Sequence, residues 1–405
     1  MSPKPRARFT LLGMVILATV GYTLLSAQQK PSASATMPVF QVDPAWPRLP
    51  NNRVVGVVSA VNVDSHDNVW ILHRPRSVPE GMKDRAAPPV LEFNANGQFV
   101  TAWGGSGQGY DWPDTEHGIF VDSKDNVWIT GSGAASTPAA RSDDMAIKFT
   151  TQGKFIVQIG ARTQNHGNAD TKNLRQPADV FVYSKTNEAF FADGYGNRRV
   201  IVFDADTGAF KRMWGAFGNK PEDAPPNPSA EPGAARGRGA PAPAKLETEG
   251  PGPQQFGTPV HSVKVSNDDL VYVADRSNRR VQVFTLDGKY VKQGFLNRAG
   301  PSPSSVCGLA FSPDREQQFL YVADYGNSHI AVLNRKTLEV LYQFGIRNES
   351  PGNFRGPHHL AVDSKGNLYV AEVAPGNRAQ KFLFKGMSAT PPPNALTPAQ
   401  LSAAH

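Results

Sequence analysis

The feature that most constrains this chain is an internal repeat that recurs six times. Each copy contains an apolar strand, a turn rich in Asp, Ser and Asn, a second apolar strand that usually ends in Ala-Asp, and a further strand after an Asn-containing turn. The copies begin near Val61, Ile119, Asp179, Ser262, Gly308 and His359. Short alternating strands joined by such turns are typical of small antiparallel sheets. Six sheets in series predict an all-β fold, a six-bladed β-propeller.

The last copy lacks one strand. Copies one to five continue into a fourth strand, as in FVTAWG from Phe99, whereas the sixth stops at Phe384. The segment from Val39 to Val42 has strand character and no other partner. We therefore expect this N-terminal strand to complete the sixth blade and close the ring, which would remove exposed sheet edges.

Several segments lie outside the repeats. Residues 1–27 carry a basic start and an apolar run, so we expect a cleaved signal peptide, with an uncleaved membrane anchor as the alternative. Residues 28–38 are interpreted as a linker, 39–386 as the propeller and 387–405 as a flexible tail. Residues 219–255, rich in Pro, Ala and Gly, are interpreted as a disordered insertion. We expect the folded part to be extracytoplasmic, periplasmic or secreted, and monomeric.

Composition excludes several classes of protein. The chain has 405 residues and a single cysteine, Cys307, so it has no intramolecular disulfide and no cysteine-based zinc finger. Removing the three charges of Lys4, Arg6 and Arg8 lowers the formal charge from +7 to about +4, too little to indicate binding to nucleic acid. The motifs G-x-S-x-G and H-E-x-x-H are absent, which disfavours serine hydrolase and zincin chemistry.

One repeat position carries histidine on alternate copies. Five residues before the first turn of each copy stand Ser59, His117, Ala178, His261, Cys307 and His358. Alternate blades of a six-bladed ring are about 120° apart around its axis, so these three imidazoles would converge on one point. Three histidines with an open position are typical of a catalytic zinc ion, although iron, copper or manganese would also accept them. The alternative is three separately packed histidines.

Other residues of the same types are assigned different roles. Cys307 shares the ring position, where a buried thiol is more usual than a fourth metal ligand. His329 occupies an arginine position of the repeat and is interpreted as scaffold, while His73 and His359 are expected beside the proposed centre.

Large polar residues follow the second strand of several copies. Tyr195, Arg276 and Tyr325 each stand two residues before a turn Asn, and Arg74 lies at a similar height in the first copy. We expect Tyr195, Arg276 and Arg74 at the mouth of the channel. A metal ion beside arginines and a tyrosine suits an anionic substrate whose hydroxyl loses its proton during the reaction.

These motifs resemble the NHL-repeat propellers and, among them, the peptidyl-α-hydroxyglycine α-amidating lyases, or peptidylamidoglycolate lyases. The resemblance covers most of residues 55–385 and is closest in EHGIFVDSKDNVWIT, PVHSVKVSNDDLVYVADRSNRRVQVF and PHHLAVDSKGNLYVAE. It implies zinc held by His117, His261 and His358. It also implies Tyr195 as the base and Arg74 and Arg276 as active-site arginines.

The sequence departs from this family at His359. The resemblance implies Asp at this position, as a ligand of a structural calcium ion together with the main-chain oxygens of Val61 and Ile119. Imidazole in place of a carboxylate removes a hard oxygen ligand, which weakens the expectation of calcium.

The resemblance implies an exported zinc-dependent lyase that cleaves the C–N bond of a peptidyl-α-hydroxyglycine-type carbinolamide. We expect it to bind a small-molecule or peptide substrate with a carboxylate, and we expect no binding to nucleic acid. Contact with a membrane would occur only through an uncleaved N-terminal anchor. Two alternatives stay open. One is a different metal-dependent reaction in the same channel, such as hydrolysis or lactone opening; the other is a non-enzymatic propeller that binds protein or glycan.

Overall fold

Twenty-four strands in the described residues pair into six antiparallel four-stranded sheets. The computed structural model describes residues 1–2, 36–135, 141–223, 248–300, 302, 304–397 and 400–401. The signal or anchor expected in residues 1–27 lies, apart from its first two residues, outside this part. Within the described part, no helix combines the length and the apolar character needed to cross a membrane.

The first three blades are consecutive in the chain. Blade one consists of β2 (Val57–Val63), β3 (Val69–Arg74), β4 (Val90–Phe93) and β5 (Phe99–Trp103). Blade two consists of β6 (Glu116–Val121), β7 (Asn126–Gly131), β8 (Met145–Thr150) and β9 (Phe155–Gly160). Blade three consists of β10 (Asp179–Tyr183), β11 (Glu188–Asp193), β12 (Arg199–Asp204) and β13 (Phe210–Trp214).

The last three blades include the strand that closes the ring. Blade four consists of β14 (Val260–Val265), β15 (Leu270–Asp275), β16 (Arg280–Thr285) and β17 (Tyr290–Phe295). Blade five consists of β18 (Val306–Phe311), β19 (Phe319–Asp324), β20 (His329–Asn334) and β21 (Val340–Phe344). Blade six consists of β22 (Pro357–Val362), β23 (Leu368–Glu372), β24 (Arg378–Ser388) and β1 (Met37–Asp43). Short 3-10 helices are η1 (Pro75–Ser77), η2 (Glu80–Arg85), η3 (Ala216–Gly218) and η4 (Arg276–Asn278).

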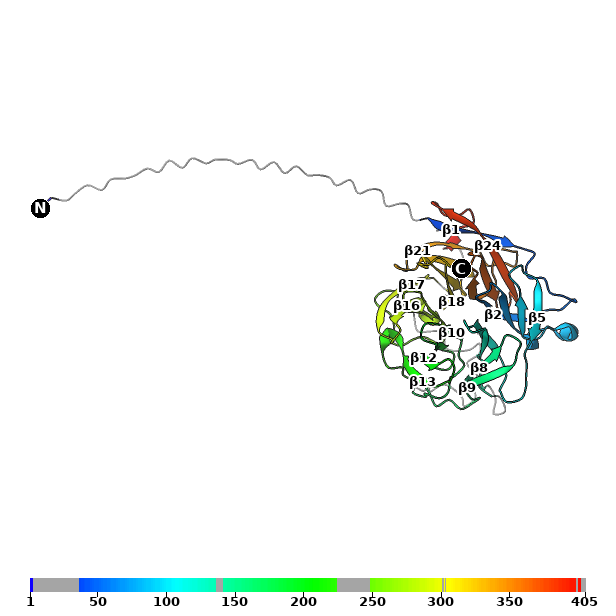
Figure 1. The fold of residues 1–405 in the computed structure, drawn as a ribbon. Helices are drawn as coiled ribbons and strands as arrows, with labels where there is room; N and C mark the ends of the chain where they lie inside the picture. The colour runs from blue at the N-terminus through cyan, green and yellow to red at the C-terminus, as the bar shows by residue number, and fades with distance from the viewer. Residues whose placement is uncertain are drawn as a thin grey trace. The chain divides into compact units, whose positions relative to one another are not determined.

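The blades surround one axis. Figure 1 shows β2, β10 and β18 near the centre of the ring and β5, β9 and β13 toward its rim. The first strand of each blade contacts the first strand of the next, from β2 through β6, β10, β14, β18 and β22 back to β2. The fold is therefore the predicted six-bladed β-propeller, and these six inner strands form the wall around the axis.

The ring closes as the sequence predicted. β1 pairs antiparallel with β24, with Phe40 opposite Phe384. The Phe40 side chain is 5% exposed. Its ring centroid lies 5.5 Å from that of Tyr321 and 6.1 Å from that of Phe344, both in blade five. The N-terminal strand thus completes the sheet of blade six and fills the interface with blade five.

The repeat signature has a cause in the first turn of the blades. In blade one, the Asp64 carboxylate accepts hydrogen bonds from the main-chain N–H groups of His66 and Asn68, at 2.9 and 2.8 Å. The same carboxylate accepts one from Trp70 Nε1 at 3.0 Å. Asp122 bonds the corresponding groups in blade two. A single carboxylate therefore fixes the turn and anchors the second strand, because it satisfies main-chain donors that the turn leaves unpaired.

Two boundaries differ from the expected ones. β24 runs on to Ser388, and the main-chain N–H of Leu396 donates to the Gln343 oxygen at 2.7 Å. This part of the expected flexible tail is therefore attached to blade five. The ends of the expected insertion 219–255 are also held, because Arg280 donates to the main-chain oxygens of Pro251 and Pro253 at 3.0 and 2.7 Å. Residues 224–247 of the insertion lie outside the described residues.

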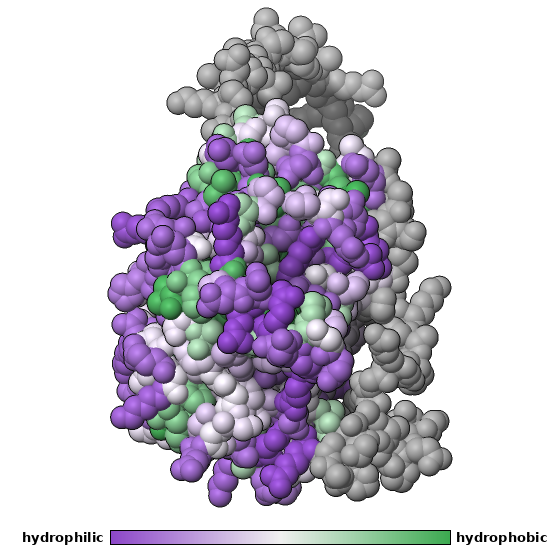
Figure 2. All heavy atoms as spheres, turned by 90° about the vertical axis from the view of Figure 1, so that its right-hand side faces the viewer, coloured by the Kyte–Doolittle hydropathy of each residue, from purple (hydrophilic) through white to green (hydrophobic). Residues whose placement is uncertain are grey.

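The surface is mainly polar. On the face shown in Figure 2, hydrophobic side chains lie in small separate groups among hydrophilic ones. The exposed large hydrophobic residues include Val100, Ile156, Phe210 and Val291, which lie on four different outer strands. The outer strands therefore expose single apolar residues, as ordinary protein surfaces do.

Candidate metal centre

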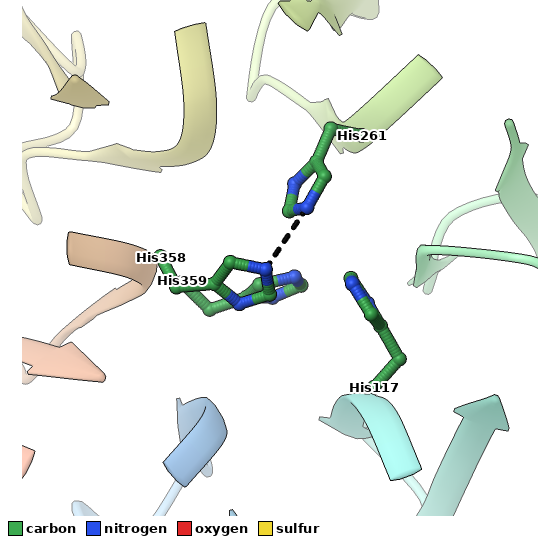
Figure 3. A group of neighbouring side chains, drawn as sticks. All are labelled: His117, His261, His358 and His359. Carbon is green, nitrogen blue, oxygen red and sulfur yellow. Dashed lines mark hydrogen bonds between the residues drawn. The ribbon is translucent and has the colours of Figure 1, made fainter. Parts of the chain in front are cut away.

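Three histidines converge on the axis of the ring. His117, His261 and His358 are each the second residue of an inner strand, β6, β14 and β22, in blades two, four and six. Their exposed fractions are 1%, 0% and 2%. Their ring centroids lie 4.5 to 5.0 Å apart. Figure 3 shows the rings turned toward a common centre from three sides. The repeat position that carries histidine in alternate copies thus becomes a cluster of three imidazoles, called the triad below.

The intervening blades orient these rings. The Nδ1 atoms of His117, His261 and His358 bond to the main-chain oxygens of Ala178, Cys307 and Ser59, at 2.7, 3.1 and 2.6 Å. Each of these oxygens belongs to the ring position of the next blade. A carbonyl only accepts, so every Nδ1 carries the proton and donates it, and every Nε2 presents a lone pair. Outer hydrogen bonds of this kind are typical of metal-binding histidines.

The inward nitrogens need a cation between them. His261 Nε2 and His358 Nε2 lie 3.0 Å apart, with a lone pair on each. Burial, the largest cause, lowers the pKa of all three rings well below the usual range, and the neighbouring histidines lower it further. Protonation is therefore disfavoured. Three neutral imidazoles fit a divalent transition metal such as zinc, copper, iron or nickel.

A tyrosine links the triad to an arginine. The Tyr195 hydroxyl donates to His117 Nε2 at 3.0 Å and accepts a hydrogen bond from Arg276 Nη1 at 3.1 Å. Burial raises the Tyr195 pKa, while Arg276 and Arg74 act in the opposite direction. Burial outweighs the two arginines, so the net direction of the Tyr195 pKa is upward.

The position of these residues follows from strand pairing. Second strands run antiparallel to the inner strands, so their ends lie beside the starts of the inner strands, where the triad is. Arg74 at the end of β3 pairs with Val57 at the start of β2. Its Nε donates to the main-chain oxygen of Glu116, the residue before His117, at 2.8 Å. The Arg276 guanidinium lies 4.8 Å from the centre of the Tyr325 ring. The aromatic ring of Tyr325 therefore packs against the Arg276 guanidinium.

His73 is not a member of the cluster of ligating histidines. It is buried in β3, where its Nδ1 accepts a hydrogen bond from the Gly56 N–H at 3.2 Å and its Nε2 bonds to the Pro88 oxygen at 3.0 Å. Burial lowers its pKa to about 4. Both ring nitrogens are thus engaged within blade one.

His329 lies in β20, where its Nδ1 donates to the Gly345 oxygen at 2.7 Å.

Cys307 touches the triad as a thiol. Its Sγ lies 3.3 Å from Nδ1 and 3.5 Å from Nε2 of His261. Burial raises its pKa to about 12. Since a thiolate rather than a thiol binds metals, the structure gives Cys307 the packing role that the sequence analysis favoured.

His359 joins the triad in one cluster. The ligating atoms of His117, His261, His358 and His359 all lie within 4.8 Å of one another. Strict alternation along a strand would send two consecutive side chains to opposite sides. The pairing of β22 with β23 shifts register between Pro357 and Leu360, across both histidines. A β-bulge of this kind re-aims side chains, and neither composition nor spacing had indicated it.

The residues around His359 do not fit calcium. The nearest carboxylate is that of Asp179, whose Oδ1 lies 3.9 Å from His359 Nδ1. Its Oδ2 already accepts hydrogen bonds from Ser262 Oγ at 2.7 Å and from the Lys264 ammonium at 2.6 Å. Calcium requires several free oxygen ligands, and an adjacent ammonium opposes a second cation. The main-chain oxygens of Val61 and Ile119 would therefore lack the carboxylate partner that the resemblance implied.

Comparisons with known proteins agree with this architecture. The model of the NHL repeat matches residues 260–284. The chain is 27% identical over 357 residues to NHL repeat-containing protein 3 of Mus musculus. This alignment covers 85% of this chain and 84% of the mouse protein. It is 25% identical over 377 residues to peptidyl-alpha-hydroxyglycine alpha-amidating lyase 1 of Drosophila melanogaster, covering 85% of this chain and 60% of the fly protein.

A third relative contains the same region within a longer protein. The chain is 25% identical over 346 residues to peptidylglycine alpha-amidating monooxygenase of Rattus norvegicus, covering 81% of this chain and 30% of the rat protein. The repeat, the ring and these relatives lead to one conclusion. The chain is a six-bladed β-propeller with an NHL repeat, and its sequence is similar to those of the peptidyl-α-hydroxyglycine α-amidating lyases.

Proposed function

We propose that this chain is an exported, zinc-dependent carbon–nitrogen lyase. Its substrate would be a peptidyl-α-hydroxyglycine-type carbinolamide, and its products an amide and glyoxylate. The observation that carries the proposal is the position of the Tyr195 hydroxyl, 3.0 Å from His117 Nε2 and 3.1 Å from Arg276 Nη1. A base thus stands between a metal-binding cluster and a cation that can hold a carboxylate. Two relatives that carry the name of this lyase, one from Drosophila melanogaster and one from Caenorhabditis elegans, support the same reaction.

The ion and the arginines have separate tasks. A zinc ion held by His117, His261 and His358 would supply positive charge that lowers the pKa of the substrate hydroxyl and of the neighbouring phenol. Arg74 and Arg276 would bind the substrate carboxylate and orient the hydroxyl toward Tyr195, because a guanidinium fork matches a carboxylate.

Tyr195 would move the proton. Its phenolate oxygen takes the proton from the substrate hydroxyl, and the oxygen lone pair forms the C=O bond of glyoxylate as the C–N bond breaks. The electron pair of that bond passes to the amide nitrogen, which receives the proton back from Tyr195. Atoms and charge balance, since one carbinolamide yields one amide and one glyoxylate.

Export would follow from residues 1–27, and the enzyme would act as a monomer on a substrate with a carboxylate.

The substitution Tyr195→Phe tests the proposed base. We expect the loss of one general base to reduce glyoxylate release from a synthetic peptidyl-α-hydroxyglycine by at least about 100-fold. The zinc content, measured by elemental analysis, should stay at the wild-type value. Tyr325→Phe is the matched control, because Tyr325 contacts Arg276 through its ring; its rate should fall by no more than a few fold.

Three results would contradict the proposal. Full activity of Tyr195→Phe would remove the base. Turnover of lactones or esters without glyoxylate release would indicate a different metal-dependent reaction in the same channel. Purified protein without any bound transition metal would favour a propeller that binds a protein or glycan.

A further inference from the structure

His359 has no role in the proposed reaction, although it lies within the metal-binding cluster. Its side chain is 3% exposed, and its ring centroid lies 4.9, 5.5 and 5.4 Å from those of His358, His117 and His261. It is thus nearly equidistant from all three members of the triad. Figure 3 shows its ring directed toward the same centre as the other three.

The Nε2 atom of His359 is unsatisfied. Among the described residues it has no hydrogen-bond partner, although it is buried. Leaving a buried polar nitrogen without a partner is unfavourable, so native proteins usually satisfy such atoms. The three triad histidines, in contrast, are each fixed by a hydrogen bond from Nδ1 to a main-chain oxygen. The unsatisfied atom therefore points to a ligand that the protein residues do not supply.

His359 directly follows the triad histidine His358 in β22 (Pro357–Val362). The later residues of this strand, Leu360 to Val362, line a cavity of about 250 Å³ together with Lys264 and Phe120. Lys264 and Phe120 are each three residues beyond a triad histidine. Along β22, His359 therefore stands between a triad histidine and the residues that line this cavity.

We propose that His359 is a fourth ligand of the same metal ion. The inference rests on the proposed function only in requiring that the triad binds an ion. Four imidazoles complete a tetrahedral set, so the substrate would have to enter as a fifth ligand from the Tyr195 side. This ligand set favours ions that accept five nitrogen and oxygen ligands, and it is expected to bind more tightly than a three-histidine site.

Cobalt binding to the full chain tests the proposal. The protein is stripped of metal with a chelator and loaded with one equivalent of Co²⁺, and X-ray absorption counts the imidazoles around the ion. We expect four in the wild type and three in His359→Gln. Chelator competition should show at least tenfold weaker Co²⁺ binding by this variant, and the visible cobalt spectrum should change with the loss of one nitrogen ligand.

His329→Gln is the matched control. His329 is also a buried histidine with a partnerless Nε2 among the described residues, but it lies in β20, outside the cluster. Its variant should keep the wild-type affinity and the wild-type spectrum, which separates ligation from a general loss of stability.

The outcomes distinguish this inference from the proposed function. Cobalt with three imidazoles in the wild type, or equal affinity in His359→Gln, would overturn the fourth ligand and leave the lyase proposal standing. No cobalt binding would overturn both. If His359→Gln does not fold, the count of imidazoles in the wild type decides the question alone.

Discussion

At the scale of single residues, the triad depends on the backbone of residues that carry no imidazole. Ser59, Ala178 and Cys307 hold the same repeat position as the triad histidines, and each supplies its main-chain oxygen to a histidine Nδ1. Their side chains can therefore differ, as serine, alanine and cysteine do. The six equivalent positions act as three pairs, in which one blade supplies the ligand and the next supplies its orientation.

His73 provides a test of stability against pH that is independent of the metal centre. Its pKa is lowered by burial to about 4 in the folded protein, against 6.5 for an exposed histidine. Below about pH 6.5 the unfolded chain therefore binds a proton that the folded protein does not. The free energy of unfolding should fall as pH drops from about 6.5 to 4, by about 3 kcal/mol in total from this group, and should not depend on it above pH 6.5.

Removing the imidazole isolates this contribution. Urea unfolding of His73→Gln, measured at several pH values, should show a slope between pH 6.5 and 4 that is shallower than in the wild type. The control His66→Gln removes an imidazole whose side chain is 63% exposed and therefore shows the effect of losing an exposed histidine. Equal slopes in all three proteins would show that the imidazole of His73 does not titrate differently on folding.

The sequence predicted the convergence of His117, His261 and His358 because repeat counting and rotational symmetry suffice for that inference. It also placed His359 beside the centre, as the structure shows, but it did not predict that the ring turns inward, since a regular strand alternates its sides and the bulge in β22 depends on how the blade pairs. Likewise, His73 stands near the end of the first blade's second strand, but only the fold shows that Gly56 and Pro88 engage both of its nitrogens.

At the scale of elements, buried ion pairs join the second strand of a blade to the third. Asp275 at the end of β15 and Arg280 at the start of β16 lie 2.7 Å apart, and both side chains are 0% exposed. The same arginine donates to the oxygens of Pro251 and Pro253 at the end of the insertion. The Ala-Asp and Asn-x-Arg parts of the repeat thus fix the turn of the blade and the segment that leads into it.

Arg280→Met should be strongly destabilising. Burial already raises the pKa of Asp275, and removing the guanidinium leaves a buried carboxylate without its cation. We expect a loss of about 3–5 kcal/mol in the free energy of unfolding, measured with urea.

Arg378→Met is the comparison. Arg378 bonds Glu372 in blade six at 2.7 Å, but its side chain is 27% exposed. Water can partly replace it, so we expect a smaller loss, about 1–2 kcal/mol. A larger loss in Arg378→Met than in Arg280→Met would contradict the assignment of the cost to burial.

At the scale of the whole molecule, the first and last strands of the propeller pair in one blade. The sequence predicted this because one strand was missing at the C-terminal end and one was unpaired at the N-terminal end. The attachment of Leu396 to Gln343 was not predictable from composition, since a Pro- and Ala-rich segment shows no periodic pattern. Closure holds the six inner strands in register around the axis, and the triad requires this because its members come from three different blades.

Phe40 is the residue through which closure can be tested. It is 5% exposed and lies against Tyr321 and Phe344 of blade five and Phe384 of blade six. Phe40→Ala should therefore leave a cavity at the seam and lower the free energy of unfolding by about 3–5 kcal/mol, measured by urea unfolding. Gln41→Ala, at the exposed neighbouring position of the same strand, should change it by no more than about 0.5 kcal/mol. If both variants unfold at the same urea concentration as the wild type, β1 contributes little to closing the ring, and the strand pairing of β24 alone would have to hold the last blade in place.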